Sequence, residues 1–279
     1  MVAANLDVVP LTGALGSRVA GVDLSSDLDD ATMEAIGKAF LNHHVLVFPE
    51  QALSPERQVA FTRRFGAVEP HPLGSRRGVE GFPEVLVLQN RPGKPGARND
   101  GWHSDITCSE RPPALSVLHA LEVPENRGDT MFCNMVRAYE TLSQGMQAML
   151  ARMTALHSAE DLVRRNNEPG TDALPIPECP PPAIHPVVRT HPESGSRALF
   201  VNPGFTIAFE DMTREESAPL LAWLYDWSTQ HHNIYRHRWQ KGDVLMWDNR
   251  SVMHYAVHDY DETMPRLMHR TTAAGDRPV

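Results

Sequence analysis

The chain has 279 residues, of which 41% are hydrophobic and 22% are charged, and its formal net charge is −9 at pH 7. This length and composition allow a full hydrophobic core, and the negative charge excludes nucleic acid as a general partner because no basic face can form. No run of about 18 apolar residues occurs, so we expect no membrane partner and no membrane-spanning segment.

The cysteines and the first residues predict a cytoplasmic protein. Cys108, Cys133 and Cys179 are odd in number and widely spaced, which argues against a disulfide framework. The N-terminal stretch has no basic region followed by an apolar one, so we do not expect a secretory signal. The sequence leaves open whether the chain forms a homo-oligomer, either a dimer or a tetramer.

Two helices separated by a short strand are predicted near the N-terminus. The stretch "ATMEAIGKAFLNHH" has apolar residues at helical spacing, and Asp29 or Asp30 can cap its start. In "LSPERQVAFTRRFG", Ser54 is the expected N-cap, Pro55 lies in the first turn and Gly66 marks the end. Between them, "VLVFP" is typical of a short buried strand.

After residue 80 the pattern changes to short strands separated by Gly, Pro, Asn and Asp. These are "EVLVLQN", "LSVLHAL", "DTMFCNM", "HPVVRTH", "RALFVNPGF", "IYRHRW", "DVLMWDN", "MHYAV" and "RLMHRTT". Helices are expected around Ala138–Leu156 and Thr213–Gln230; a capping box from Thr213 to Glu216 favours the second, and Pro219 should bend or delay it. Many short strands without alternating helices predict an antiparallel sandwich or jelly roll flanked by helices.

A proline-rich segment interrupts this series near residues 164–186. It carries seven prolines between Pro169 and Pro186, so it cannot be a central strand or a long helix. A domain linker is one interpretation. A lid-like loop over a pocket is favoured, because strands of the same type continue on both sides. We therefore expect residues 1–279 to form a single domain with this insertion.

The stretch "WHSD" places an imidazole and a carboxylate two residues apart, at His103 and Asp105. In a strand both side chains would point to the same face. A pair of this kind is usually two surface polar groups, and neighbouring Cys108 is more typical of a buried apolar position. A third ligand, His254, follows the turn-like "WDNR". Two histidines and one carboxylate leave three coordination positions open, as in non-haem Fe(II) oxygenases, whereas a structural zinc site would want four ligands.

The open positions would have to bind a co-substrate. 2-Oxoglutarate can chelate iron through its keto acid end, and an arginine then neutralises its distal carboxylate. Arg266 and Arg270 lie four residues apart in "MPRLMHRTT", on one face of the expected strand. Thr130 could add a hydroxyl donor. Taken alone, each arginine could be a solvated edge charge and Thr130 an ordinary strand residue.

Five blocks of the sequence, in order, resemble the taurine dioxygenase family: "WHSD", "GDT", "HPVVRTHP", "WDNRSVMHYAV" and "RLMHRTT". The resemblance implies a mainly β fold with flanking helices, namely a double-stranded β-helix (a cupin-like jelly roll of the clavaminate synthase-like kind). It implies that His103, Asp105 and His254 bind Fe(II), and that Thr130 and Arg266 bind 2-oxoglutarate. Arg270 resembles an arginine that meets the anionic end of the primary substrate close to the keto acid.

Four further residues are candidates for substrate binding. His71, Asn99 and Phe205 match substrate-pocket positions of the family, and Ile106 follows the "WHSD" block. Taken alone, His71 is a loop residue and Phe205 a core residue. Gly74 stands where the taurine enzyme has a tyrosine, and a polar contact of that enzyme falls near Leu162 and Val163. The missing tyrosine side chain at Gly74 predicts a substrate bulkier than taurine.

The resemblance implies an Fe(II)- and 2-oxoglutarate-dependent dioxygenase that consumes O2 and releases succinate and CO2. Its substrate is expected to be a small organic anion, either a sulfonate like taurine or an alkyl sulfate. The alternatives are a dioxygenase for an aryloxyalkanoate or another carboxylate, and a non-catalytic metal-binding jelly roll. A zinc hydrolase would leave Arg266 and Thr130 without a function.

Overall fold

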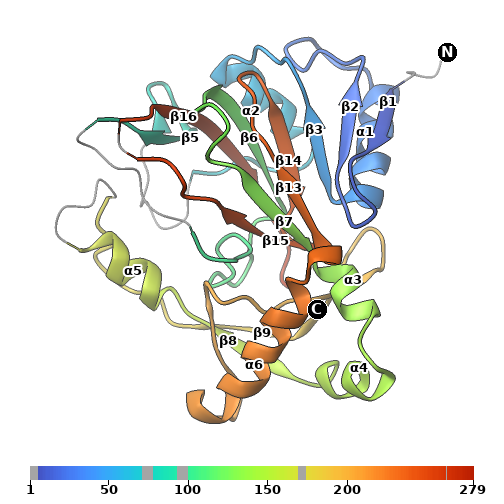
Figure 1. The fold of residues 1–279 in the computed structure, drawn as a ribbon, viewed down its shortest axis with the longest axis vertical. Helices are drawn as coiled ribbons and strands as arrows, with labels where there is room; N and C mark the ends of the chain where they lie inside the picture. Colours follow the sequence, from blue (N-terminus) through green and yellow to red (C-terminus); the bar gives the residue numbers. More distant parts are fainter. Residues whose placement is uncertain (1–5, 71–77, 93–99, 169–173, 262) are drawn as a thin grey trace.

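The computed structural model describes residues 6–70, 78–92, 100–168, 174–261 and 263–279, and its centre is one twisted sheet (Figure 1). Neighbouring strands of this sheet are antiparallel, apart from the parallel pair β2 and β3. Their order across the sheet is β1 (Asp7–Pro10), β2 (Ser17–Ala20), β3 (Val45–Phe48), β14 (Val244–Asp248), β6 (Leu115–Glu122), β16 (Arg266–Ala273), β5 (Phe82–Asn90) and β4 (Gly78–Val79). The prediction of a mainly β protein with flanking helices is confirmed.

A second, antiparallel sheet of three strands faces the first. Its order is β13 (Ile234–His237), β7 (Thr130–Asn134) and β15 (Val252–Ala256). Side chains alternate between the two faces of the main sheet, as the pleat of a strand requires. In β14, Leu245 and Trp247 enter the core next to the second sheet, whereas Val244 and Met246 enter the core beneath the N-terminal helices.

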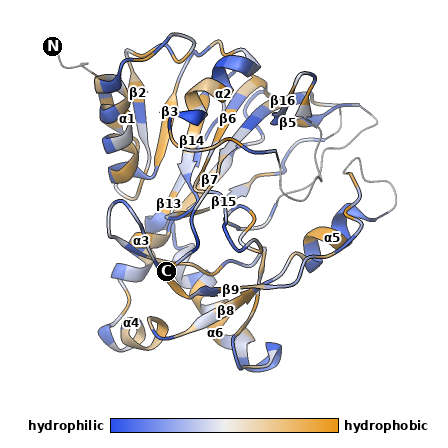
Figure 2. Cartoon of the chain, turned by 180° about the vertical axis from the view of Figure 1, so that it is seen from behind, coloured by the Kyte–Doolittle hydropathy of each residue, from blue (hydrophilic) through white to orange (hydrophobic). Residues whose placement is uncertain are grey.

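The two N-terminal helices cover the outer face of the main sheet and match the prediction. Helix α1 (Asp30–His43) begins after Asp29, whose side chain accepts a hydrogen bond from the backbone N–H of Thr32. Helix α2 (Pro55–Arg63) begins after Ser54, which accepts from the N–H of Arg57. Strand β3 lies between them in the chain; it is hydrophobic along its length (Figure 2), and all four residues are buried.

The helix predicted around Ala138–Leu156 is wrong in its extent. The structure has two short helices, α3 (Met135–Glu140) and α4 (Gln144–Leu150), followed by strand β8 (Thr154–His157). Each helix has its own N-cap, because Asn134 accepts from the N–H of Arg137 and Ser143 from the N–H of Met146. A second start signal inside a periodic segment therefore divides it into two helices.

The later elements pack around these helices in the lower part of Figure 1. Strand β8 is the centre of a three-stranded sheet with β9 (Ala183–Pro186) and β12 (Thr206–Phe209), and β10 (Val188–Thr190) pairs with β11 (Arg197–Leu199). Helix α6 (Arg214–Ser228) has the predicted capping box between Thr213 and Glu216, and Pro219 lies inside it without delaying its start. A 3₁₀ turn, η1 (His231–Asn233), leads into β13.

The proline-rich segment contains more regular structure than its composition predicts. Its first residues belong to helix α5 (Glu160–Asn166), and its last residues form β9, an edge strand that pairs with β8. An edge position agrees with the expectation that this segment is not a central strand.

The three cysteines are free thiols, as predicted. Within the described ranges, every helix is too short or too polar to cross a bilayer.

Candidate active site

His103 and His254 are joined through their backbones. The N–H of His103 donates to the carbonyl of His254 at 3.0 Å, and the N–H of His254 donates to the carbonyl of His103 at 2.7 Å. This isolated bridge pairs His103 with the middle of β15, and the two imidazole centroids lie 4.1 Å apart. Two residues 151 positions apart are thus fixed side by side by main-chain geometry.

Asp105 reaches the same place through a turn, so the prediction that His103 and Asp105 project from one face of a strand is wrong. Asp105 opens a turn in which Ile106 has a positive φ of 47°. The Oδ1 atom of Asp105 lies 4.0 Å from Nε2 of His103 and 3.8 Å from Nε2 of His254. One donor atom from each of the three residues lies within 4.8 Å of the others.

Both imidazoles are in the state that a metal ligand needs. Nδ1 of His103 lies 2.8 Å from the carbonyl oxygen of Gly101, so this nitrogen donates and Nε2 keeps its lone pair. Burial lowers the pKa of His103. Burial and the neighbouring His103 lower the pKa of His254, so both rings are neutral. The donor set of two neutral imidazoles and one carboxylate fits a divalent metal with open coordination positions.

The carboxylate of Asp105 is held from both sides. Ser116 donates its hydroxyl to Oδ2 at 2.8 Å, and Arg270 donates from Nη1 to Oδ1 at 3.1 Å. Burial alone would raise the pKa of Asp105, but Arg270, the two imidazoles and Ser116 lower it below its usual value. Asn249 supports this arrangement, because it accepts from the backbone N–H of Asp105 at 3.3 Å and donates to Ser116 at 3.2 Å.

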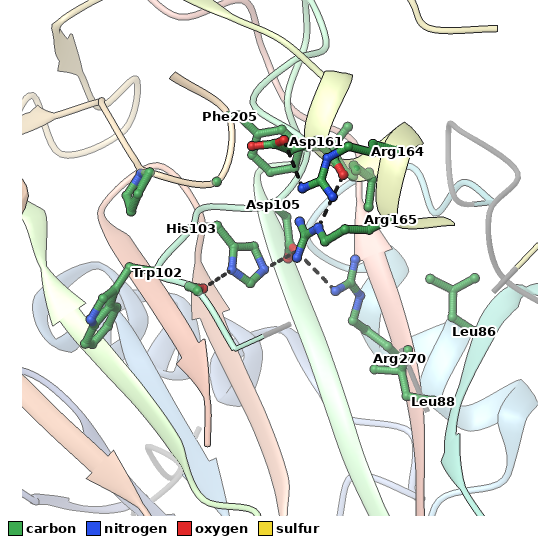
Figure 3. A pocket seen from close by; sticks show the side chains of 15 residues that line it. Leu86, Leu88, Trp102, His103, Asp105, Asp161, Arg164, Arg165, Phe205 and Arg270 are labelled. Carbon is green, nitrogen blue, oxygen red and sulfur yellow. Dashed lines mark hydrogen bonds and ion pairs between the residues drawn. The ribbon is translucent and has the colours of Figure 1, made fainter. Parts of the chain in front are cut away.

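A cavity of about 280 Å³ opens above His103 and Asp105 (Figure 3). Its apolar wall includes Leu86 and Leu88 of β5 together with Ile106 and Phe205. Its polar wall includes Arg270 and several charged residues of α5. The cavity can therefore take a ligand that has both an apolar part and an anionic group.

Gly204 lets the chain pass close to His103 at the base of this cavity. A Cβ atom at Gly204 would lie 2.8 Å from Cβ of His103, which is closer than two carbon atoms approach without a bond. Residue 204 must therefore stay without a side chain if His103 keeps its position. Gly204 is not among the residues predicted for the site, although a glycine in "VNPGF" is a signal for a close backbone approach.

The other predicted residues are distributed as follows. Ile106, Phe205 and Arg270 line the cavity, whereas Thr130 and Arg266 do not. Thr130 accepts a hydrogen bond from Nε1 of Trp239 at 2.9 Å. His71, Gly74 and Asn99 lie outside the described residues.

Arg266 lies near the start of strand β7, beside Gly128. A Cβ atom at Gly128 would lie 3.4 Å from Nε of Arg266 and 3.2 Å from the ring of Tyr260. Gly128 also has a positive φ of 71°, so both its conformation and its surroundings require glycine. The Nε atom of Arg266 is buried and has no hydrogen-bond partner among the described residues. The guanidinium therefore has capacity for an anionic ligand.

A buried polar network behind the Asp105 turn was missed by the sequence analysis. Nδ1 of His157 lies 2.9 Å from the hydroxyl of Thr107, which also accepts from Asn202 at 3.0 Å. Nε2 of His185 lies 2.9 Å from the carbonyl oxygens of both Thr107 and Ser109. These contacts tie the turn to β8 and β9. Sequence alone does not indicate them, because the partners are about 50 to 100 positions apart.

Comparison with known proteins gives consistent matches over nearly the whole chain. Residues 7–272 match the model of the family described as "Taurine catabolism dioxygenase TauD, TfdA family". An alpha-ketoglutarate-dependent sulfate ester dioxygenase of Pseudomonas putida is 36% identical, over 99% of this chain and 92% of that protein. An alkylsulfatase of Acinetobacter baylyi is 34% identical, over 98% and 86%. The crystal structure of a taurine dioxygenase from Burkholderia xenovorans superposes with a TM-score of 0.82 at 34% identity, covering 98% of this chain and 91% of that one.

The buried His157 predicts a specific pH dependence of stability. Burial and the neighbouring His185 lower the pKa of His157 to about 3, so the unfolded chain binds a proton below pH ~6.5 that the folded chain excludes. This contribution to stability is complete above pH ~6.5 and decreases as the pH falls toward 3. The variant His157→Asn lacks this pH-dependent contribution. The difference in free energy of unfolding between wild type and variant should therefore be about 2 kcal/mol smaller at pH 5 than at pH 7.5. Urea unfolding at the two pH values measures this; an equal difference at both would contradict it.

Proposed function

The chain belongs to the taurine catabolism dioxygenase (TauD, TfdA) family, and from this premise we propose that it hydroxylates a small organic sulfate ester or sulfonate, using Fe(II), 2-oxoglutarate and O2. As a member of this family it is a 2-oxoglutarate-dependent dioxygenase. The observation that supports the proposal most directly is the cluster of His103, Asp105 and His254, of which His103 and Asp105 line a cavity that is apolar on one side and cationic on the other.

We infer that the two facing sheets form a double-stranded β-helix and that residues 1–279 are a single domain. The core shared by β14, β6 and β16 with β13, β7 and β15 supports this fold. In this view the segment near residues 164–186 is an insertion whose first part, α5, forms a wall of the cavity. The insertion would act as a lid over the bound substrate.

His103 and His254 would bind Fe(II) through Nε2, and Asp105 through Oδ1. When bound, the iron supplies the activation of O2 that protein side chains cannot provide. The protein fixes the ligands: Gly101 sets the tautomer of His103, and Ser116 and Arg270 hold the carboxylate of Asp105. Without these partners the donor atoms could not keep one geometry.

Arg266 and Thr130 would bind the distal carboxylate of 2-oxoglutarate. Burial lowers the pKa of Arg266, which means that its charge is poorly compensated by the protein. A carboxylate would compensate it through a charge-assisted pair. Because Trp239 donates to the Thr130 oxygen, the hydroxyl proton of Thr130 stays available to donate to the same carboxylate.

The cavity favours a substrate with an alkyl chain. Leu86, Leu88 and Phe205 form an apolar surface, and Arg270 supplies positive charge close to Asp105. The relatives that act on sulfate esters and alkyl sulfates support the same class. His71 and Asn99 remain proposed substrate contacts. Gly74 also lies outside the described residues; from the absence of a tyrosine side chain there, we propose that the enzyme accepts a substrate larger than taurine.

Substrate preference tests the proposal directly. Substrate-dependent succinate release gives kcat/KM for each of four compounds: taurine, hexanesulfonate, hexyl sulfate and an aryloxyacetate. We expect the hexyl compounds to exceed taurine, because each methylene buried on the apolar wall contributes about 0.8 kcal/mol. The highest kcat/KM for the aryloxyacetate would contradict the sulfate and sulfonate assignment and indicate a carboxylate substrate.

The metal ligands give a second prediction. His103→Ala, Asp105→Ala and His254→Ala should each abolish succinate release, because each removes one of only three proposed donors. The matched control is Asp161→Asn, which changes a carboxylate of the same cavity outside the cluster and should keep metal binding. Anaerobic titration with Fe(II) and 2-oxoglutarate measures binding by the metal-to-ligand charge-transfer band. Turnover at the wild-type rate in any of the three variants would refute the assignment.

The co-substrate site gives a third prediction. Arg266→Ala should weaken 2-oxoglutarate binding by on the order of 2–5 kcal/mol, because the distal carboxylate loses its ion-pair partner. Thr130→Ala should weaken it by about 1 kcal/mol, as for one neutral hydrogen bond. The same charge-transfer band, titrated with 2-oxoglutarate at saturating Fe(II), gives both affinities. If Arg266→Ala binds 2-oxoglutarate as the wild type does, Arg270 becomes the first candidate for this function.

A further inference from the structure

Helix α5 presents charged side chains to the cavity. The helix contributes Asp161, Leu162, Arg164 and Arg165 to the cavity lining. In Figure 3 the side chain of Arg165 extends from α5 toward the side of the cavity where Asp105 and Arg270 meet. Arg165 is half-buried.

The charges of α5 are paired, except for that of Arg165. Arg164 donates to Oδ1 of Asp161 at 3.3 Å and to Oε1 of Glu168 at 2.8 Å. Glu160 accepts from Arg214 at 2.7 Å. Arg165 donates only from Nε, to the backbone carbonyl of Asp161 at 3.3 Å, and within the described ranges no carboxylate pairs with it. Its two terminal nitrogens therefore have capacity for an anion.

Arg270 cannot serve an incoming anion with its full charge. Its Nη1 already donates to Oδ1 of Asp105 at 3.1 Å, so the pair is close to neutral as a unit. An anion placed beside Arg270 also approaches the carboxylate of Asp105, which repels it. A second cation that lines the same cavity offsets this repulsion, and Arg165 of α5 supplies one.

We propose that Arg165 is a specificity-determining residue that binds the anionic group of the primary substrate together with Arg270. A sulfate or sulfonate has three terminal oxygens, so it can accept from two guanidinium groups at once. A carboxylate, with two oxygens, gains less from the second arginine. This inference rests on the proposed function and adds a residue that would make the site favour sulfur oxyanions.

Spectroscopic titration of Arg165→Gln tests the proposal. The anaerobic complex of the whole protein with Fe(II) and 2-oxoglutarate is titrated with hexyl sulfate, and the shift of the charge-transfer band gives the half-saturating concentration. We expect Arg165→Gln to raise this concentration about 10- to 100-fold, between the effects known for exposed and for buried charge pairs. Arg165→Lys should retain part of the affinity, because it keeps the charge but loses the planar donors.

Arg164→Gln is the matched control, because it removes a neighbouring arginine of the same helix that is already paired with carboxylates. It should change hexyl sulfate binding by less than about threefold. The half-saturating concentration of 2-oxoglutarate should be the same in the wild type and Arg165→Gln, and the loss for phenoxyacetate should be smaller than for hexyl sulfate.

Each other outcome has a distinct meaning. Equal hexyl sulfate affinity in the wild type and Arg165→Gln overturns the proposal and leaves the proposed function intact. An equal loss in Arg164→Gln overturns it in favour of a general charge effect. Weaker 2-oxoglutarate binding in Arg165→Gln overturns it by assigning Arg165 to the co-substrate. No charge-transfer band in the wild type contradicts the proposed function itself, and a band that no organic anion shifts contradicts both.

Discussion

The buried charge of Asp105 is the constraint around which the site is built. A carboxylate that is only 3% exposed loses its hydration by water. The free-energy cost of this loss is large unless charged and hydrogen-bonding partners offset it. Arg270 and Ser116 supply those partners from β16 and β6, which are neighbours in the main sheet. The sheet must therefore be formed before the carboxylate can be buried in its ionised state. The site and the fold thus depend on each other.

The position of the site also depends on the alternation of side chains between the two faces of the main sheet. One face of β14, β6 and β3 packs under the N-terminal helices, and the other face packs against the second sheet. Asn249, one residue after β14, then reaches both the backbone of Asp105 and the hydroxyl of Ser116. A shift of one residue in the pairing of these strands would exchange the two faces and separate these partners.

Local signals in the sequence predict most of the elements, whereas the three clustered donors are indicated by the ordered blocks that resemble a known family. The caps at Asp29, Ser54 and Thr213 act within a few residues of themselves, so the helices that they begin could be located. The turn at Asp105 could not be predicted, because it is held by residues such as Asn249 that are distant in the chain. Arg165 was missed for a related reason: α5 is short, and the neighbouring prolines suggested a loop.

The backbone bridge between His103 and His254 has a consequence for metal choice. The hydrogen bonds of the bridge are between backbone atoms only, so folding places the backbone segments that carry the two rings side by side. A preassembled site discriminates weakly among divalent ions of similar size, because no rearrangement of the chain makes the binding free energy of one ion more favourable than that of another. Affinity at such a site follows the general order of the first-row metals, in which iron ranks below cobalt, nickel and copper. Which ion occupies a site of this kind is then decided by supply in the surrounding medium.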